Sequence, residues 1–193
     1  MANFIDEFMK NYGSEVTKNM SSTFNLDQGT VRKLIPQLAP LILSGLKKQK
    51  DEQGGDGRVD HILNKYGDQS VLNNIRDLIS AKANDTTTDS RLGGLLGESG
   101  PQAANVLGKQ LNIDASVIQK MIPALAPLIL GALSKKRDVG GSGISGIGSL
   151  LDADGDGSIL DDVAGFLLKG GTSKQAGNKN VLGSLLGKFL RTK

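Results

Sequence analysis

The sequence contains one stretch twice: FNLDQGTVRKLIPQLAPLILSGLKKQKD at residues 24–51 and LNIDASVIQKMIPALAPLILGALSKKRD at residues 111–138. An offset of 87 residues aligns the two stretches without a gap, and half of the 28 positions are identical, including both prolines. Self-similarity at a fixed spacing is the sequence signature of repeated structural units. We therefore interpret the chain as an internal duplication, with two tandem copies of one unit.

Both stretches are predicted to be helical. Aromatic residues make up only 4% of the chain, while Leu, Ala, Lys and Gln are plentiful, and this composition favours helix over strand. Asp27 and Asp114 are natural N-caps of the helices that follow. Because proline lacks an N–H group, we expect these helices to end before Pro36 and Pro123, and new helices to begin with those prolines in the first turn. The second proline of each stretch, four residues later, is expected to kink the new helix or reset its start.

A shorter amphipathic pattern precedes each stretch. At the same offset, Ile5, Phe8 and Met9 align with Leu92, Leu95 and Leu96. Their spacing of three and four residues predicts a short helix in each copy, followed by a second helix at roughly residues 14–24 and 101–111. The basic residues near the end of each stretch, Lys47-Lys48 and Lys135-Lys136-Arg137, are expected to lie at helix C-termini, where cations oppose the helix dipole. A phosphate- or nucleic-acid-binding patch is the alternative interpretation of these residues.

The C-terminal residues begin the opening pattern a third time. Residues 182–187 read LGSLLG and match LGGLLG at residues 92–97. They follow a Gly-, Ser- and Lys-rich segment, residues 170–179, that is predicted to be a flexible linker. We expect residues 180–193 to form an amphipathic helix. This helix has three interpretations: it packs back on the second copy as a cap, it is exchanged with a neighbouring molecule, or it attaches to a membrane surface.

These patterns predict an all-α fold, a multihelical array from two tandem repeats with a C-terminal helix that begins a partial third repeat. The first repeat spans residues 1–90 and the second spans residues 91–169. A chain of 193 residues is long enough to bury a core, either as one large domain or as two small ones.

One loop carries the requirements of a metal ion. Residues 152–162 read DADGDGSILDD, and a D-x-D-x-D-G run folds three carboxylates around one point, as calcium needs with its six to eight oxygen ligands. The twelfth position is Val163, where an EF-hand has a closing Glu, so the loop resembles the shorter calcium loops of this type. The predicted ligands are Asp152, Asp154, Asp156, Ser158 through its carbonyl oxygen, and Asp161 and Asp162, one of which closes the shell. The alternatives are magnesium or manganese in place of calcium, or a metal-free turn in which Ser158 and Asp161 form a capping box.

The first copy has lost most of these carboxylates. An offset of 88 places residues 64–74 over the calcium loop, with Asn64, Tyr66, Asn73 and Asn74 in place of aspartates and only Asp68 retained. Too few carboxylates remain for tight calcium binding. We predict that residues 64–74 keep the same turn by hydrogen bonding alone.

Composition and motifs exclude most enzyme classes. The chain has no Cys and a single His, His61, so thiolate and multi-histidine metal sites are excluded and Ser-His-Asp catalysis is disfavoured. Residues 141–146 match G-x-G-x-x-G, but no strand is predicted before them, so the dinucleotide-binding interpretation fails. The N-terminus lacks the pattern of a secretory signal, and the longest apolar run, residues 121–133, is too short for a membrane span and contains two prolines. We therefore expect a cytoplasmic protein that is not an enzyme.

The paired L-x-P-x-L-A-P-L-I-L segments, the LGGLLG runs and the D-x-D-G-D-G-S loop resemble the bacterial domain-of-unknown-function family 937, the YidB-like proteins. The resemblance covers residues 1 to about 170. It implies an all-helical array with a helix-turn-helix-like portion, and it brings no activity and no site residues.

Two functions are carried forward from the sequence. The leading hypothesis is a non-enzymatic scaffold or interaction module with one structural Ca²⁺, unknown partners and self-association through its Gly- and Leu-rich helices. The alternative is a nucleic-acid-binding protein that uses the Lys- and Arg-rich helix ends, although the net charge of +3 is mild.

Overall fold

The computed structural model describes residues 4–87 and 89–139, which contain seven α-helices, two short 3-10 helices and no strand. The α-helices are α1 (Phe4–Asn11), α2 (Gly13–Phe24), α3 (Gln28–Gln53), α4 (Gly55–Tyr66), α5 (Ile75–Asn84), α6 (Ser99–Leu111) and α7 (Ala115–Val139). The 3-10 helices are η1 (Gln69–Asn73) and η2 (Leu92–Gly94). The all-α prediction is thus confirmed for the part of the chain that the structure describes. The calcium loop, the linker, the C-terminal helix and the 141–146 motif lie outside these residues.

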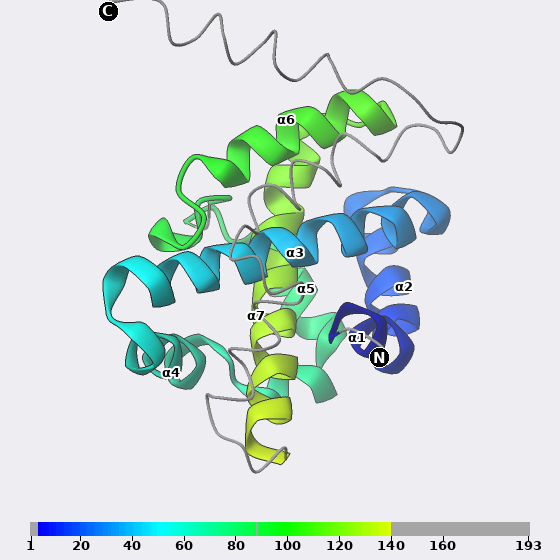
Figure 1. Ribbon diagram of the computed structural model, residues 1–193. Helices are drawn as coiled ribbons and strands as arrows, with labels where there is room; N and C mark the ends of the chain where they lie inside the picture. The colour runs from blue at the N-terminus through cyan, green and yellow to red at the C-terminus, as the bar shows by residue number, and fades with distance from the viewer. Residues whose placement is uncertain (1–3, 88, 140–193) are drawn as a thin grey trace, which may run out of the picture.

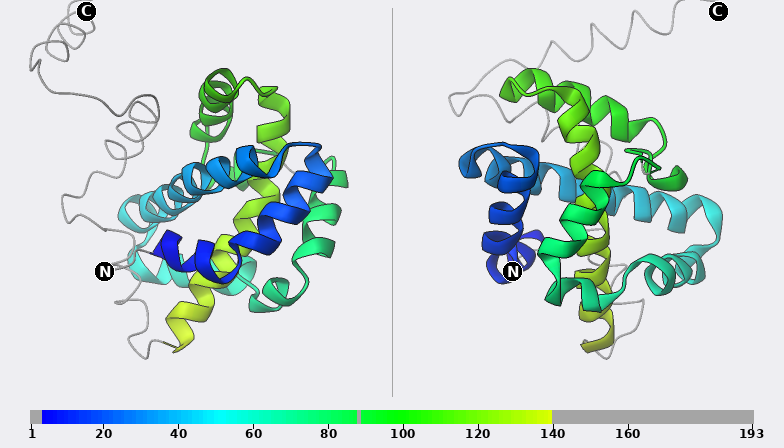
Figure 2. Two further views of the ribbon diagram at one scale, coloured as in Figure 1. Left: turned by 90° about the vertical axis from the view of Figure 1, so that its right-hand side faces the viewer. Right: turned by 180° about the vertical axis from the view of Figure 1, so that it is seen from behind.

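Two long helices cross at the centre of the fold. α3 runs across the front of α7 in Figure 1, and the two helices are in contact. α7 also packs against α2, α4, α5, α6 and η1, and Figure 2 shows it running through the middle of the other helices. The second half of the described chain therefore shares its contacts with the first half.

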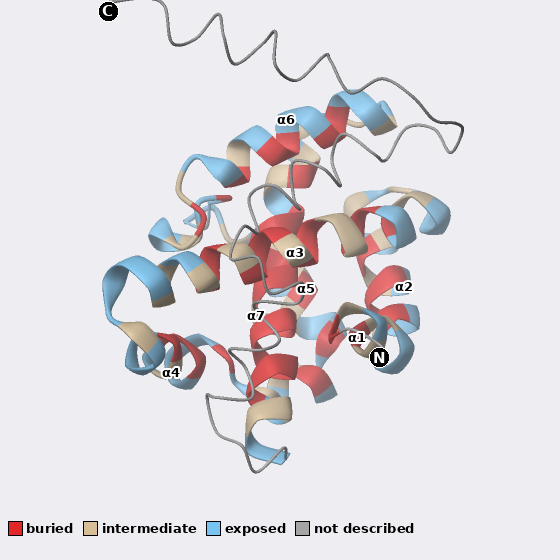
Figure 3. Cartoon of the chain, viewed as in Figure 1, coloured by how far each residue is buried: buried red, intermediate tan, exposed pale blue. Residues whose placement is uncertain are grey.

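One hydrophobic core joins all seven helices. Its buried side chains come from every α-helix, and α6 contributes Ala103, Ala104 and Leu107. Figure 3 shows the buried residues concentrated along α7 and on the inner faces of its neighbours. Among the described helices, α7 alone is long and apolar enough to cross a membrane by length and composition, but 72% of its most apolar window is buried inside the protein. That burial is typical of the core helix of a soluble protein.

The expected breaks at the prolines do not occur. α3 continues through Pro36 and Pro40, and α7 continues through Pro123 and Pro127. Each proline removes one helical hydrogen bond, which costs about 3 kcal/mol or more. In compensation, α3 buries ten residues and α7 fourteen, and full burial of a large aliphatic side chain contributes about 1.5–3 kcal/mol. The free energy gained by burying these side chains therefore outweighs the tendency of proline to end a helix.

The basic residues Lys47 and Lys48 lie inside a helix rather than at its end. α3 runs on to Gln53, and the two lysines form i, i+4 ion pairs with Asp51 and Glu52. The prediction for the other copy is confirmed, because Lys136 and Arg137 lie in the last turn of α7. The longer first helix follows from the residues after Lys48, since the sequence QKDEQ contains no helix breaker before Gly54.

Helix pairs 87 residues apart have the same corners. α2 ends at Asn25 and α6 at Asn112, both in the left-handed conformation with φ of 52° and 53°. The next residue in each pair donates its backbone N–H to an equivalent carbonyl, Leu26 to Ser21 at 3.1 Å and Ile113 to Gly108 at 2.9 Å. The predicted second helix of each copy is therefore present, with the same three-residue turn into the long helix.

The short opening helix forms only in the first copy. α1 is an α-helix, whereas residues 92–97 form a 3-10 turn in which Gly93, Gly94 and Gly97 have positive φ. These glycines stand where α1 has Asp6, Glu7 and Lys10. Glycine is a poor helix former and adopts positive φ freely, so the prediction of a helix from Leu92, Leu95 and Leu96 was wrong.

Candidate functional site: a groove between α4 and α7

The predicted calcium ligands, Asp152, Asp154, Asp156, Ser158, Asp161 and Asp162, all lie outside the described residues. Their first-copy counterpart is described, and it is a hydrogen-bonded turn. The Asp68 carboxylate accepts hydrogen bonds from the backbone N–H of Ser70 at 2.8 Å and from its hydroxyl at 2.7 Å. These bonds, the backbone bond first, hold the pKa of Asp68 below its usual value. The turn is thus held by hydrogen bonds from Ser70. Within residues 4–87 and 89–139, no group of three or more His, Cys, Asp or Glu side chains could hold a metal ion.

The same turn is tied to the end of α7 by a guanidinium group. Arg137 donates to the Asn64 side-chain oxygen at 3.0 Å and pairs with Asp60 at 2.9 Å and with Asp138 at 2.8 Å. Gln69 also donates to Asp138, at 2.5 Å. The bond to Asp138, the largest cause, and the pair with Asp60 raise the pKa of Arg137. The basic end of α7 is therefore used to hold α4 and η1 in place.

Two further cations of that helix end contact α1 and the residue that follows it. Lys136 forms an ion pair with Glu7, and Lys135 donates to the Tyr12 hydroxyl at 3.3 Å. Together with the contacts of Arg137, these bonds connect the predicted basic patch to neighbouring helices. This is the structural role expected of helix-terminal cations, and it weakens the case for a phosphate-binding patch at this end.

A groove lies over α7, between α4 and the segment that precedes α6. It has a volume of about 590 Å³. Pro123, Ala126, Pro127 and Leu130 form its floor, because their spacing of three and four residues places them on one face of α7. Proline has no N–H, so Pro127 donates no hydrogen bond to the Pro123 carbonyl oxygen in this floor.

The rim of the groove is polar and the walls are mixed. Arg58 and Tyr66 of α4 line one side, and Leu92 and Leu95 line the other. Arg58 donates from Nε to the Gln49 side chain at 3.0 Å, and the Tyr66 side chain is 55% exposed. An apolar floor with a polar rim is the form of a site that receives an apolar chain segment.

The wall formed by Leu92 and Leu95 is held against α3 by a close backbone approach. A Cβ atom at Gly45 would lie 2.6 Å from the Leu95 carbonyl oxygen and 2.8 Å from a methyl carbon of Leu96. Any larger residue at position 45 would therefore displace this segment. The sequence offered one signal for this contact, because Gly45 lies inside a long helical pattern. Glycine is a poor helix former, so its presence there indicates a close packing contact.

A second close approach positions the opposite side. Gly67 follows α4, and a Cβ atom there would collide with Ser134 Oγ and lie 2.8 Å from the Leu130 carbonyl oxygen. α4 and α7 can thus approach closely only because residue 67 has no side chain. The sequence analysis identified Gly67 only as part of the degenerate loop and missed this role.

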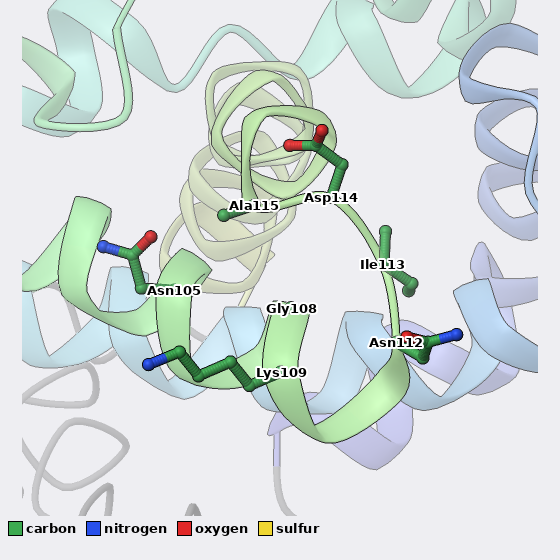
Figure 4. A pocket seen from close by; sticks show the side chains of 7 residues that line it. All are labelled: Asn105, Gly108, Lys109, Asn112, Ile113, Asp114 and Ala115. Carbon is green, nitrogen blue, oxygen red and sulfur yellow. The ribbon is translucent and has the colours of Figure 1, made fainter.

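A smaller pocket lies at the corner between α6 and α7. It has a volume of about 320 Å³ and is lined by polar residues that include Asn105, Lys109 and Asp114 (Figure 4). The Asp114 carboxylate accepts from the backbone N–H of Ser116 at 2.8 Å, and hydrogen bonds from Ser116 lower its pKa. Asp114 therefore caps the N-terminus of α7, as predicted. The pocket is the hollow beside this capped turn between α6 and α7.

The described residues thus define a helical protein with an apolar groove and with acidic side chains committed to helix caps and turns. A family model described as "Bacterial protein of unknown function (DUF937)" matches residues 6–136 and again residues 139–191. The chain belongs to this family. No curated protein and no solved structure matches it.

Proposed function

We propose that this protein is a non-enzymatic helical interaction module of the cytoplasm that self-associates through the groove between α4 and α7. The observation that carries the proposal is the apolar floor on α7, bounded by a wall that is itself an L-G-x-L-L-G segment. The proposed occupant is the third segment of that pattern, residues 182–190, from a second copy of the chain.

The fold shows how such segments pack. Leu95 and Leu96 of the second segment lie against Gly45 on the long helix of the other repeat. α1, the first segment, packs against α3, and its Glu7 forms an ion pair with Lys136 of α7. Both opening segments therefore lie against long helices. Residues 182–190 carry the same leucines, which supports a long helix as the surface that they bind.

Association is tested by measuring mass in solution. We expect the full chain to form dimers or larger species as concentration rises, and a chain ending at residue 181 to remain monomeric. Pro127→Lys should also weaken association, because it places a cation in the groove floor opposite the basic residues Lys188 and Arg191. Val106→Lys is the matched control, since Val106 is 42% exposed on α6 away from the groove.

Two outcomes would overturn this function. If the full chain is monomeric at all concentrations, there is no self-association. If it is monomeric and removal of residues 182–193 lowers its melting temperature, these residues pack within their own chain.

A structural calcium ion in residues 152–162 is a further part of the proposal. It is supported by the ligand pattern of the loop and by the contrast with the described turn at Asp68, where two hydrogen bonds from Ser70 replace a cation.

Nucleic-acid binding is the second candidate, and one observation favours it. α2–α3 and α6–α7 are helix pairs joined by three-residue turns, and Arg32, Lys33 and Lys120 are exposed near the starts of the second helices. A helix-turn-helix presents such residues to DNA phosphates and base edges. A gel shift with duplex DNA that weakens with salt would support this candidate, and no shift at low ionic strength would remove it.

A further inference from the structure

The helix–turn–helix arm that follows α3 packs on α7 through a defined set of side chains. The arm comprises α4, η1 and α5, all of which contact α7. Its buried apolar residues are Val59, Ile62, Leu63, Leu72, Ile75 and Ile79. The close approach at Gly67 fixes where the turn of the arm meets α7.

The same set of residues recurs 88 positions later. The counterparts of the six buried residues are Ile147, Leu150, Leu151, Leu160, Val163 and Leu167, and Gly155 is the counterpart of Gly67. Hydrophobic residues make up 38% of the chain, so about two of six positions would be apolar by chance. All six are apolar, which predicts a second arm with the same buried face.

The described helices indicate where a second arm would pack. α2 contacts α7, and its counterpart α6 contacts α3. Such an exchange is what a two-fold relation between the two copies would produce. The face of α7 that receives the first arm then has an equivalent face on α3.

That equivalent face is more exposed and more polar than its counterpart. On α7, a Cβ atom at Gly131 would lie 2.8 Å from the Asp68 carbonyl oxygen and 3.2 Å from Val71. Gly131, Ser134 and Ala124, which precedes Gly131 by two helical turns on the same side of the helix, are all buried. The equivalent residues of α3 are Gln37, Ser44 and Lys47, all half-buried.

Charge and size on this face suit the second arm. The Ser44 hydroxyl donates to the Leu41 carbonyl of its own helix at 2.8 Å, so this small side chain is satisfied without a partner from the arm. Lys47 stands where α7 has Ser134, and its ammonium lies 2.7 Å from Asp51. The second arm contains five aspartates between residues 152 and 162, where the first arm has mostly amides. A cation on the helix thus matches the acidic turn of the arm.

We propose that residues 147–167 form a second arm that packs on the α3 face made by Gln37, Ser44 and Lys47, with the aspartate loop beside Lys47. The inference is independent of self-association through the groove, because the groove floor is on α7. It gives the calcium loop a mechanical role, since an ion bound there would stabilise the turn that meets α3.

Cross-linking in the full chain tests this placement, because the protein contains no Cys. The test pair is Ser44→Cys with Ile159→Cys, the counterparts of Gly131 and Val71. The reference pair is Gln69→Cys with Asp138→Cys, whose side chains are hydrogen-bonded at 2.5 Å across the first arm. The control pair is Thr30→Cys with Ile159→Cys, since Thr30 lies in the first turn of α3.

With a short bismaleimide, we expect the test pair to link within one chain to an extent comparable to the reference pair and about tenfold above the control pair, because adjacent groups have a much higher effective concentration. A yield equal to that of the control pair would overturn the inference. So would a link found only between chains, which would place the arm on a second copy. Asp51→Cys with Ser158→Cys, near the counterparts of Asp138 and Gln69, provides a second pair if the first destabilises the fold.

Discussion

Replacing Gly67 by alanine tests the close approach that shapes the groove. Gly67 has a φ of −100°, so its backbone conformation is open to any residue. The obstacle is steric: the new Cβ would collide with Ser134 Oγ and lie 2.7 Å and 2.8 Å from the carbonyl oxygens of Leu63 and Leu130. The carbonyls belong to helices α4 and α7, so relief requires the helices to separate. Overpacking of this kind costs about 1–3 kcal/mol.

Gly57→Ala, inside α4, is the matched control for Gly67, the residue that follows this helix. Gly57 is exposed, and its added Cβ would meet nothing within 4 Å. Alanine there should stabilise α4 by about 0.5–1 kcal/mol, because glycine loses more backbone entropy on folding. The two variants should therefore differ by about 1.5–4 kcal/mol in the free energy of unfolding.

Urea unfolding measures this difference, provided that the slope with urea is the same in both variants. Adding Ser134→Ala should restore part of the stability of Gly67→Ala, because it removes one of the colliding atoms. Ser134 Oγ is buried with no hydrogen-bond partner, so this second substitution has little cost of its own. If Gly67→Ala unfolds at the same urea concentration as Gly57→Ala, the helices are not in the contact described.

Four further predictions concern the loop, the caps, the prolines and the helix end. Calcium should raise the melting temperature and a chelator should lower it, and both effects should be absent in Asp154→Ala. If a chelator leaves the wild-type melting temperature unchanged and calorimetry detects no calcium binding, residues 152–162 are a metal-free turn. The pKa values of Asp27 and Asp114 are lowered by hydrogen bonds from Thr30 and Ser116, so their stabilisation is complete above the unfolded value of 3.8 and is lost as the pH falls through the folded value. Replacing both by Asn should therefore flatten the loss of stability below about pH 4, as followed by thermal melts, and an unchanged acid profile would contradict this. Pro40→Ala should stabilise α3 by about 1–3 kcal/mol, because it restores a helical N–H group, and a lower urea midpoint would refute the reasoning. Arg137→Met should cost about 1–3 kcal/mol in urea unfolding through its lost charge-assisted bonds, and Arg137→Lys should recover only part of that loss, because lysine lacks the planar fork.

The parts of the fold that depend on local chemistry could be predicted from the sequence. The caps at Asp27 and Asp114 and the turn at Asp68 follow from short side chains that hydrogen-bond to backbone two or three residues ahead. The helical class follows from composition and spacing. These features require only residues that are close in the sequence.

The errors arose where tertiary contacts override local preference. Pro36 and Pro123 break helices in isolation, yet both lie within helices that are held by a shared core. The groove depends on Gly45 and Gly67, whose meaning becomes visible only when the segment or helix that they approach is known. Such contacts join residues 50 to 70 positions apart, and no local pattern reports them.

The described arm shows one way to hold a turn against a long helix, and the sequence of residues 152–162 predicts another. An arm that turns back along a long helix must be held against that helix at its turn. At Gly67 and Gly131 the backbones of the arm and of α7 approach so closely that no side chain fits between them. In the first arm a guanidinium group holds the turn, because Arg137 reaches Asn64 and Asp60 from the end of α7. The positions equivalent to Arg137 and Asn64 are Lys50, on α3, and Asp152. A lysine cannot donate to two groups in a fixed fork, whereas added carboxylates can create a site for a divalent cation. On the proposed placement of the second arm, the aspartates of residues 152–162 would replace the arginine, and this replacement is the structural role that we propose for a calcium ion.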